Sequence, residues 1–305
     1  MNSGVVGTFL KPVTGIEDLG PSCLIGLIGA GIQHSLAPAM QMREGTLQGL
    51  RYLYNLIDTT KLGLGQEDLP DLVTAAQRMG YNGLAVTHPF KQTIIPLLDE
   101  LSDDARALGA VNTVVLKDGK KVGHNADWYG FYEGFVRALP DVPRRRAVQL
   151  GAGGAGAAVA HAAMKLGIEE LNIFDIESSR ADHEVEALNA RFGKGRARLV
   201  RDLAASMAEA DGLIHCTPVG MGKKSDMAIP KELLRSELWV AEIVYFPLET
   251  ELLRTARALG CRTANGGGML VFQAAEQMRL FSGAPANGER MLEHFNHMAS
   301  SLIVA

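Results

Sequence analysis

A glycine-rich segment in the middle of the chain carries the clearest chemical signal. The run Gln149-Leu-Gly-Ala-Gly-Gly-Ala-Gly-Ala-Ala follows a short apolar stretch and opens a series of small residues typical of a helix. Within it, Gly151, Gly153 and Gly156 have the spacing G-x-G-x-x-G in the strand-turn-helix context that this motif requires. Such glycines permit a tight turn, a close approach of the backbone to a pyrophosphate and close packing of helix on strand. Because a helix N-terminus attracts phosphate, the segment predicts a dinucleotide site.

An acidic residue stands where such a site would bind a ribose. The predicted strand 171–174 ends at Asp175, 22 residues beyond Gly153. A carboxylate there accepts hydrogen bonds from the adenosine ribose hydroxyls and repels a 2′-phosphate. A helix N-cap is the alternative role of the same side chain. Sites for NADP usually place a cation nearby, but here Arg180 comes only five residues later, so we predict NAD as the cofactor, with NADP less favoured.

Four further segments place polar side chains at the ends or turns of predicted strands. They are His34-Ser35-Leu-Ala-Pro38, Thr87-His-Pro-Phe-Lys91, Gly109-Ala-Val-Asn112-Thr and Gly123-His-Asn-Ala-Asp127. Taken singly, Lys91 fits a surface cation, Asn112 a turn residue and Asp127 a helix N-cap. Their occurrence together points to a more specific arrangement than these roles.

The elements that must position these residues follow from the apolar pattern. Strands are predicted over 23–29, 51–58, 83–87, 112–117, 120–123, 147–150, 170–175, 212–216 and 239–245, with Asp118-Gly119 as a hairpin turn. Helices are predicted over 68–78, 92–108 with an interruption near Pro96, 269–281 and 288–302. After residue 143 strands and helices alternate, which is typical of a doubly wound parallel sheet. The predicted fold class is therefore α/β.

Composition and charge exclude several classes of protein. A length of 305 residues is about twice that of a usual domain and suggests two lobes. With 47% apolar and 21% charged residues, the chain is not of the disordered class. The net charge of −4 argues against a broad nucleic-acid surface. The uncharged stretch 21–42 contains too many polar residues, glycines and prolines for a membrane span.

The cysteines and histidines favour neither a disulfide framework nor a metal site. Cys23, Cys216 and Cys261 are scattered and odd in number, which fits a reducing compartment, so we expect a cytoplasmic protein. His294 and His297 lie three residues apart on a predicted helix, but no cysteine or cluster of carboxylates completes a zinc site. No metal is predicted.

Taken together, eight segments resemble the shikimate dehydrogenase family, and most closely its NAD-linked quinate/shikimate branch. They are GLIGAGIQHSLAPAM (26–40), NGLAVTHPFKQ (82–92), LGAVNTVV (108–115), GHNAD (123–127), the glycine-rich run, CTPVGM (216–221), VYFPLETELL (244–253) and GGGMLVFQAAEQMRLF (266–281). The resemblance implies an N-terminal α/β substrate lobe, a Rossmann-type doubly wound parallel sheet and an active-site cleft between them. Residues 1–127, completed by C-terminal helices in 268–305, would bind the substrate, and residues 128–267 the dinucleotide.

The resemblance also implies roles for particular residues. Lys91 and Asp127 correspond to the family's catalytic pair, which polarises a substrate hydroxyl and relays its proton. The residues implied in substrate binding are Ser35, Thr87, Asn112, Tyr245 and Gln273. Those implied at the cofactor are Gly151, Ala152, Gly153, Gly154, Ala155, Gly156, Asp175, Thr217, Pro218, Val219, Met221, Val244 and Gly266.

Three positions that are usually polar in this family are alanine here. Ala37 replaces the second hydroxyl of a Ser-x-Ser/Thr carboxylate clamp, Ala85 replaces an Asn, and Ala126 replaces the Thr before Asp127. Gln41 also stands where His is frequent. Losing a charge-assisted hydrogen bond costs about 1.5–3 kcal/mol, so we expect weaker binding of the substrate carboxylate or a shifted substrate.

The resemblance thus implies an NAD-dependent oxidoreductase that interconverts shikimate, quinate or both with the 3-dehydro ketone. Two alternatives stay open: a dehydrogenase of a related ring such as aminoshikimate, and a non-catalytic NAD-dependent sensor. Lys91 and Asp127 favour an enzyme, because a protein that only binds has no need of a proton-transfer pair. The implied partner is a small cyclic hydroxy acid, with no nucleic acid and no membrane, and the chain would be a monomer or a homodimer.

Overall fold

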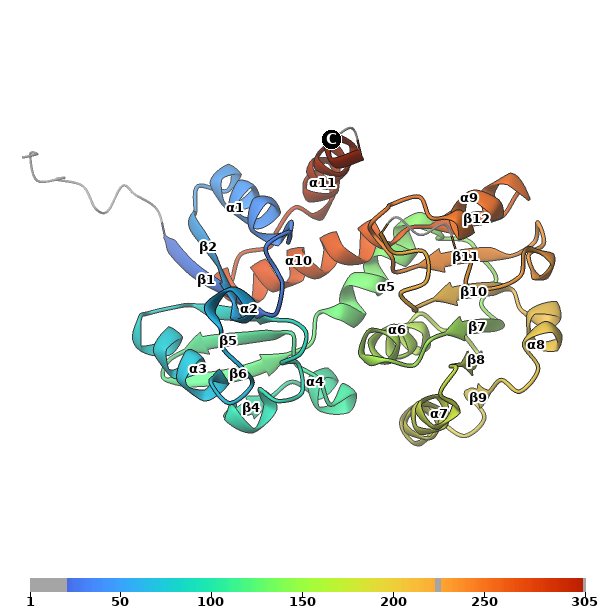
Figure 1. The fold of residues 1–305 in the computed structure, drawn as a ribbon, viewed down its shortest axis with the longest axis horizontal. Helices are drawn as coiled ribbons and strands as arrows, with labels where there is room; N and C mark the ends of the chain where they lie inside the picture. The colour runs from blue at the N-terminus through green and yellow to red at the C-terminus, as the bar shows by residue number, and fades with distance from the viewer. Residues whose placement is uncertain (1–20, 223–225, 304–305) are drawn as a thin grey trace, which may run out of the picture.

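Two six-stranded sheets, each with its own helices, form the two lobes of the molecule (Figure 1). The computed structural model describes residues 21–222 and 226–303. The strands of the first lobe are β1 (Ser22–Gly29), β2 (Arg51–Asp58), β3 (Gly83–Val86), β4 (Glu100–Leu101), β5 (Thr113–Lys117) and β6 (Lys120–His124). Their order is β2-β1-β3-β5-β6-β4, with β1 parallel to β2 and β3, and β5 antiparallel to β3 and β6. The predicted turn at Asp118-Gly119 joins β5 to β6, and both residues have positive φ.

The helices of this lobe are α1 (Ala37–Leu47), α2 (Thr59–Leu62), α3 (Leu69–Arg78) and α4 (Asp103–Leu108). The prediction of a helix over 92–108 is therefore wrong for most of its length. A short 3-10 turn over Ile95–Leu97 contains Pro96, and β4 pairs with β6 before α4 begins. Proline has no N–H group to continue a helix, and the Ser102 hydroxyl starts α4 by accepting a hydrogen bond from the backbone N–H of Ala105.

The second lobe is a doubly wound parallel sheet, which confirms the predicted fold class. Its strands are β7 (Arg146–Leu150), β8 (Glu170–Phe174), β9 (Ala197–Leu199), β10 (Gly212–His215), β11 (Trp239–Glu242) and β12 (Arg262–Ala264). They are parallel in the order β12-β11-β10-β7-β8-β9. The helices are α6 (Gly154–Lys165), α7 (Ser178–Phe192), α8 (Leu203–Glu209) and α9 (Glu251–Ala258). The sequence prediction lacks β9 and β12, because three residues are too few to show a periodic pattern.

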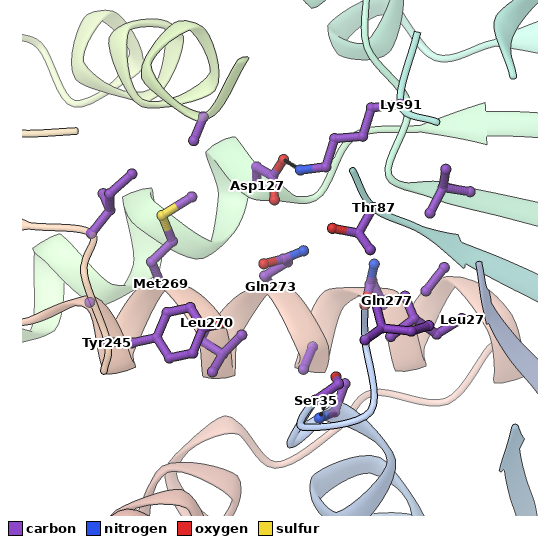
Figure 2. A pocket seen from close by; sticks show the side chains of 18 of the residues that line it. Leu27, Ser35, Thr87, Lys91, Asp127, Tyr245, Met269, Leu270, Gln273 and Gln277 are labelled. Carbon is purple, nitrogen blue, oxygen red and sulfur yellow. Dashed lines mark hydrogen bonds and ion pairs between the residues drawn. The ribbon is translucent and has the colours of Figure 1, made fainter. Parts of the chain in front are cut away.

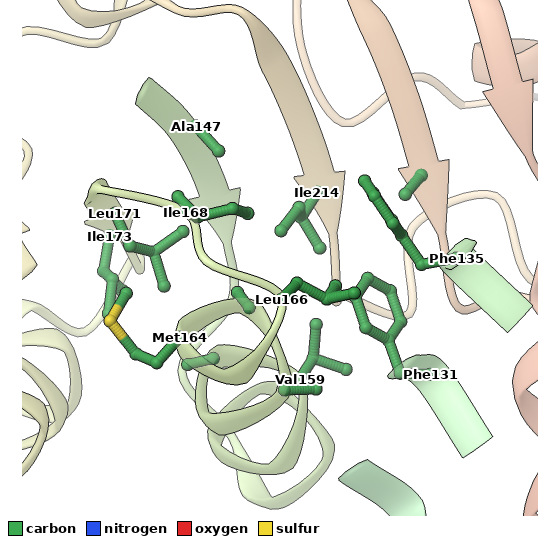
Figure 3. Packing of buried hydrophobic residues seen from close by; sticks show 14 of the residues in the cluster. Phe131, Phe135, Ala147, Val159, Met164, Leu166, Ile168, Leu171, Ile173 and Ile214 are labelled. Atoms are coloured by element: carbon green, nitrogen blue, oxygen red, sulfur yellow. The ribbon is translucent and has the colours of Figure 1, made fainter. Parts of the chain in front are cut away.

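One of the two buried cores of the second lobe lies between its sheet and two helices, α6 and α5 (Asp127–Ala138), as Figure 3 shows. Phe131 and Phe135 of α5 belong to the same buried cluster as Val159 of α6 and Ile214 of β10. The ring of Phe135 also meets Trp239 of β11 edge to face, with 5.0 Å between the ring centroids. This burial anchors α5 in the second lobe, although the helix begins just after the last described strand of the first.

Helices α5 and α10 (Gly266–Ser282) cross at close range between the lobes. A Cβ atom on Gly130 would lie 2.3 Å from the carbonyl oxygen of Met269, and one on Gly134 would lie 2.9 Å from the carbonyl carbon of Gly268. Real Cβ atoms do not approach backbone so closely, so this crossing requires glycine on α5. Beyond the crossing, α10 runs along the first lobe, where α11 (Gly288–Ile303) packs against it and against α1.

A charged cluster also joins the two lobes. The Asp104 carboxylate of α4 lies 3.0 Å from Nε2 of His161 and 3.2 Å from Nζ of Lys165, both on α6, and 3.8 Å from the Arg191 guanidinium on α7. Burial of His161, together with the positive charges of Arg191 and Lys165, lowers its pKa to about 4. The imidazole is therefore neutral at pH 7 and can donate its Nε2 hydrogen to Asp104.

Replacing Gly130 by alanine is expected to lower the free energy of unfolding by about 1–3 kcal/mol, because the new methyl group must displace the backbone of α10. In an open helix the same change stabilises by up to about 1 kcal/mol. Gly154→Ala is the matched control, since nothing lies within 4 Å of a Cβ atom at that helical position. Urea unfolding measures both variants. A Gly130→Ala variant as stable as the wild type would contradict the packing argument.

Acid is expected to destabilise the protein partly through His161. The unfolded chain takes up a proton near the ordinary histidine pKa of 6.5, whereas the folded chain does so only near pH 4. Stability from this group is therefore lost as the pH falls from about 6.5 to 4, by up to about 3 kcal/mol. Urea unfolding of the wild type and of His161→Gln across this range measures the effect, with exposed His183→Gln as the control. If His161→Gln keeps the wild-type pH dependence, the assignment is wrong.

Candidate active site

A cleft of about 400 Å³ lies between the lobes, and both lobes contribute to its walls (Figure 2). The loop after β1 supplies Ser35, the loop after β3 supplies Thr87 and Lys91, and the loop after β11 supplies Tyr245. The predicted site residues that line it are Ser35, Thr87, Lys91, Asp127, Ala155, Tyr245, Gly266 and Gln273. The structure therefore brings into one cleft the residues predicted for catalysis, most of those predicted for substrate binding and two of those predicted at the cofactor.

The Lys91 ammonium and the Asp127 carboxylate meet in this cleft, with Nζ 2.6 Å from Oδ2 (Figure 2). Asp127 is the first residue of α5, where the positive end of the helix stabilises a carboxylate. Its side chain is 5% exposed, whereas that of Lys91 is 26% exposed. The pair therefore presents to the cleft an ammonium group whose position is fixed by a buried carboxylate.

Asn112 supports this pair from a buried position. It is inaccessible to solvent and does not belong to the described cleft lining. Its Oδ1 accepts hydrogen bonds from the backbone N–H of Ala126 (2.8 Å) and from the Thr113 hydroxyl (2.7 Å), so it fixes the turn before Asp127. Its Nδ2 has no hydrogen-bond partner among the described residues. In the structure Asn112 holds the turn that leads into Asp127. Its direct contact with a substrate stays a prediction.

Three polar side chains in the cleft keep hydrogen-bonding capacity. In Figure 2 the side chains of Thr87 and Gln273 are turned toward Asp127, from the first lobe and from α10 respectively. The Ser35 hydroxyl accepts a hydrogen bond from the backbone N–H of Ala37 at 3.3 Å and retains its own hydrogen for donation. Hydroxyl and amide groups both donate and accept, so this set suits a ligand with several hydroxyl groups.

Gln277 and Tyr54 also line the cleft, and the sequence analysis missed both. Gln277 stands four residues after Gln273 and therefore on the same face of α10, which is a signal that the sequence offered. Its Nε2 donates to the backbone carbonyl of Asn112 at 3.1 Å. Tyr54 lies in β2, whose alternating burial places its side chain on the covered face of the sheet. Neither the position of Gln277 on α10 nor the alternation along β2 at Tyr54 indicates by itself that the side chain reaches a cleft.

The glycine-rich loop has the geometry of its motif. Gly151 has a φ of +96°, which favours glycine, and a Cβ atom there would lie 2.8 Å from the carbonyl oxygen of Cys216. A Cβ atom on Gly156 would lie 2.3 Å from the carbonyl oxygen of Gly151, so helix and turn pack without room for a side chain. Around Gly153 and Gly154, by contrast, nothing lies within 4 Å of a Cβ atom. The loop packs closely against the protein at Gly151 and Gly156, and no atoms of the described residues cover it at Gly153 and Gly154. This arrangement leaves room for a pyrophosphate to approach the backbone.

The Asp175 carboxylate holds this loop from the end of the next strand. Its Oδ2 accepts a hydrogen bond from the backbone N–H of Ala152 at 2.8 Å, and its Oδ1 accepts one from Glu177 at 2.9 Å. Arg180, the nearest following cation in the sequence, is paired with Glu177 at 2.7 Å. The carboxylate thus stands beside the glycine-rich loop, and the charge of the adjacent cation is balanced.

A buried hydrogen-bond network fixes the turn Thr217–Met221. Nδ1 of His215 lies 2.5 Å from Oε1 of Glu242, and Nε2 of the same ring lies 2.5 Å from the Thr217 hydroxyl. The Thr250 hydroxyl donates to the other oxygen of Glu242. Met221, at the end of the turn, is 54% exposed. The network therefore holds the backbone of the turn and leaves an apolar side chain free at its tip.

Other predicted residues lie outside the described cleft lining: Asn112, Gly151, Ala152, Gly153, Gly154, Gly156, Asp175, Thr217, Pro218, Val219, Met221 and Val244. Apart from Asn112, they follow the carboxyl ends of β7, β8, β10 and β11. Doubly wound sheets bind ligands beyond these ends, where the strand order reverses, here between β7 and β10. The residues present at this edge fit a dinucleotide.

A doubly wound sheet with a glycine-rich loop at its switch point, facing a Lys–Asp pair across a cleft, defines the class of nicotinamide-dependent oxidoreductases. Known proteins that are similar to this chain belong to the same class and identify a family within it. Residues 27–114 match the model of the shikimate dehydrogenase substrate binding domain. The chain is 52% identical over 285 residues to a shikimate dehydrogenase (NADP(+)) of Streptomyces avermitilis, covering 93% of this chain and 98% of that protein.

Relatives with NAD in their names match nearly as much of the chain. A quinate/shikimate dehydrogenase (NAD(+)) of Corynebacterium efficiens is 43% identical over 277 residues, which are 90% of this chain and 98% of that protein. The solved structure of quinate dehydrogenase from Corynebacterium glutamicum in complex with NAD superposes with a TM-score of 0.86 at 41% identity, covering 91% of this chain and all of that one. The chain belongs to the shikimate dehydrogenase family and is an enzyme, which confirms the resemblance drawn from its motifs.

Proposed function

We propose that the protein is an NAD-dependent dehydrogenase that interconverts shikimate, quinate or both with the 3-dehydro ketone. The observation that carries this proposal is the 2.6 Å contact between Lys91 and Asp127 in a cleft that also reaches the glycine-rich loop helix at Ala155. The names of the relatives support both ring acids as substrates. A dehydrogenase of a related ring such as aminoshikimate is the second candidate, because Ala37 and Ala85 alter the cleft lining and a shifted substrate would be one consequence.

The catalytic roles follow from the chemistry of alcohol oxidation. The reaction removes a hydride and a proton from a secondary alcohol, and the bound nicotinamide accepts the hydride. Lys91 is the proton-transfer group in this proposal, since its Nζ is exposed to the cleft and can contact a substrate oxygen. Asp127 orients that ammonium through the 2.6 Å hydrogen bond and can accept a second one from the substrate hydroxyl. In the oxidation direction the neutral amine form of Lys91, reached when the ammonium has released a proton to solvent, accepts the hydroxyl proton. In the reverse direction the ammonium donates a proton to the ketone oxygen, which becomes the hydroxyl.

The ring hydroxyls are bound by neutral groups in this proposal. Thr87 and Gln273 stand nearest the catalytic pair in Figure 2, and Ser35 and Tyr245 stand further along the cleft. A site built to pair each hydroxyl rejects molecules that lack one, because the protein group left unpaired is costly. Such a site recognises a polyhydroxylated ring.

Two observations support NAD over NADP. The Asp175 carboxylate stands where a ribose 2′-phosphate would be repelled, and Arg180 is held by Glu177. The relatives divide between NADP(+) and NAD(+) in their names, so this preference rests on the charges at the site.

We propose the same division of the chain as the motifs imply, with substrate bound by 1–127 and 268–305 and dinucleotide by 128–267. The separate sheets support it, although residues 1–20 and 304–305 lie outside the described part. No helix in the described residues is long and apolar enough to cross a membrane. A cytoplasmic location and a monomeric or homodimeric state remain part of the proposal; the three unpaired cysteines support the location.

Lys91→Met is expected to lower kcat about 10²–10⁴-fold with saturating substrate, because proton transfer loses its group. NADH formation with shikimate, quinate and aminoshikimate measures it, and the same panel tests the proposed function. Lys121→Met is the matched control, since that lysine is also paired with a carboxylate, at 3.0 Å from Asp99, outside the cleft lining. Near-normal turnover by Lys91→Met would contradict the catalytic role of Lys91. A wild type that is inactive on all three substrates would contradict the proposed function.

Asp175→Ser is expected to move the ratio of kcat/KM with NAD to that with NADP toward NADP by about tenfold or more, because a repulsive charge next to the 2′-phosphate is removed. Steady-state kinetics with both cofactors gives the ratio. Asp182→Ser, at an exposed position of α7, is the control for a general change in surface charge. An unchanged ratio in Asp175→Ser would show that the carboxylate only holds the glycine-rich loop.

A further inference from the structure

A buried hydroxyl group that lines the cleft, that of Tyr54 in β2, has no hydrogen-bond partner among the described residues. An unpaired buried hydroxyl is unfavourable, and in a binding cleft the bound molecule normally satisfies such a group. Burial also raises the pKa of this phenol above its ordinary value, so it stays protonated and acts as a hydrogen-bond donor.

Tyr54 belongs to a cluster of buried, mainly apolar side chains. Its apolar cluster includes Leu27, Ala37 and Ala85, and none of these side chains has a polar atom. The backbone N–H of Ala37 donates to the Ser35 hydroxyl at 3.3 Å. Ser35, Ala37 and Tyr54 all line the cleft, so Ser35 and Tyr54 each offer it a hydroxyl donor.

Other polar groups next to Tyr54 are already paired with one another. The hydroxyl of Tyr52, on the same face of β2, donates to Gln41 at 2.7 Å. Gln41 donates to Oε1 of Gln277 at 3.5 Å, and Gln277 uses its own amide group on Asn112. This network satisfies its members without a ligand. Tyr54 stands beside it and takes no part in it.

We propose that the Tyr54 hydroxyl donates a hydrogen bond to the carboxylate of the substrate, beside Ser35, to which the family resemblance already assigns this group; the inference rests on the proposed function. The reacting hydroxyl is held at the Lys91–Asp127 pair, and like charge keeps the substrate carboxylate away from Asp127. Two neutral donors can bind an anion without burying a second charge. Tyr54 is thus a binding residue for the acid group and takes no part in proton transfer.

Tyr54→Phe removes the hydroxyl and keeps the ring, so it tests the contact with little change in packing. With the ring acid as substrate, KM is expected to rise about 10- to 100-fold, as for loss of a hydrogen bond to a charged group, while kcat and the KM for NAD stay within about threefold. With an analogue that lacks the carboxyl group, wild type and variant should have equal kcat/KM.

Tyr52→Phe is the matched control, because it removes a buried hydroxyl of the same strand that is already paired with Gln41. Its KM for the ring acid should stay within about threefold of wild type. An unchanged KM in Tyr54→Phe would overturn the proposal. So would an equal loss with and without the carboxyl group, or the same rise in KM in Tyr52→Phe. These results leave the proposed function standing, whereas a wild type inactive on every ring acid overturns both.

Discussion

The close crossing of α5 and α10 is the constraint on which the active site depends. A Cβ atom on Gly130 would meet both the backbone of Met269 and the side chain of Gln273, so the two helices touch where their side chains would otherwise keep them apart. Asp127 stands one turn before Gly130, and the separation of its carboxylate from Gln273 is therefore set by backbone contact. Because α5 is anchored in the core of the second lobe and α10 continues along the first, the same contact also spaces the walls of the cleft.

Buried hydrogen-bond networks fix the loops that the helices do not reach. Asn112 binds the turn before Asp127, and the amide of Gln277 ties α10 to Asn112. On the other side of the cleft, His215 and Glu242 hold the turn that begins at Thr217. A buried network of this kind is rigid when each polar group has a hydrogen-bond partner, and an unpaired group in it destabilises the fold. These polar side chains therefore bond to one another, whereas hydroxyl and amide groups such as those of Ser35 and Gln273 face the cleft.

The sequence predicts best those parts of the molecule whose signal is local. The spacing of the glycines in 151–156 and the alternation of short strands with helices depend on neighbouring residues, so the doubly wound sheet and its loop could be predicted. The segment 92–108 could not, because β4 forms only by pairing with β6, about twenty residues later. Access of Tyr54 and Gln277 to the cleft could not be predicted either, since it depends on which side chains of other elements leave them uncovered.

The charge distribution in the cleft determines how it can discriminate among ligands. Among the described lining residues, Lys91 and Asp127 form an ion pair, so their opposite charges balance each other. Net electrostatic attraction therefore contributes little to the binding of an acidic ring. In the binding mode proposed above, neutral donors such as Ser35 and Tyr54 bind the ring through the direction and length of their hydrogen bonds. Hydrogen bonds of this kind separate ligands that differ by one hydroxyl more sharply than apolar contact does. If the ion pair contacts the reacting hydroxyl as proposed, a cleft with neutral donors around that pair is suited to choosing among ring acids of equal charge.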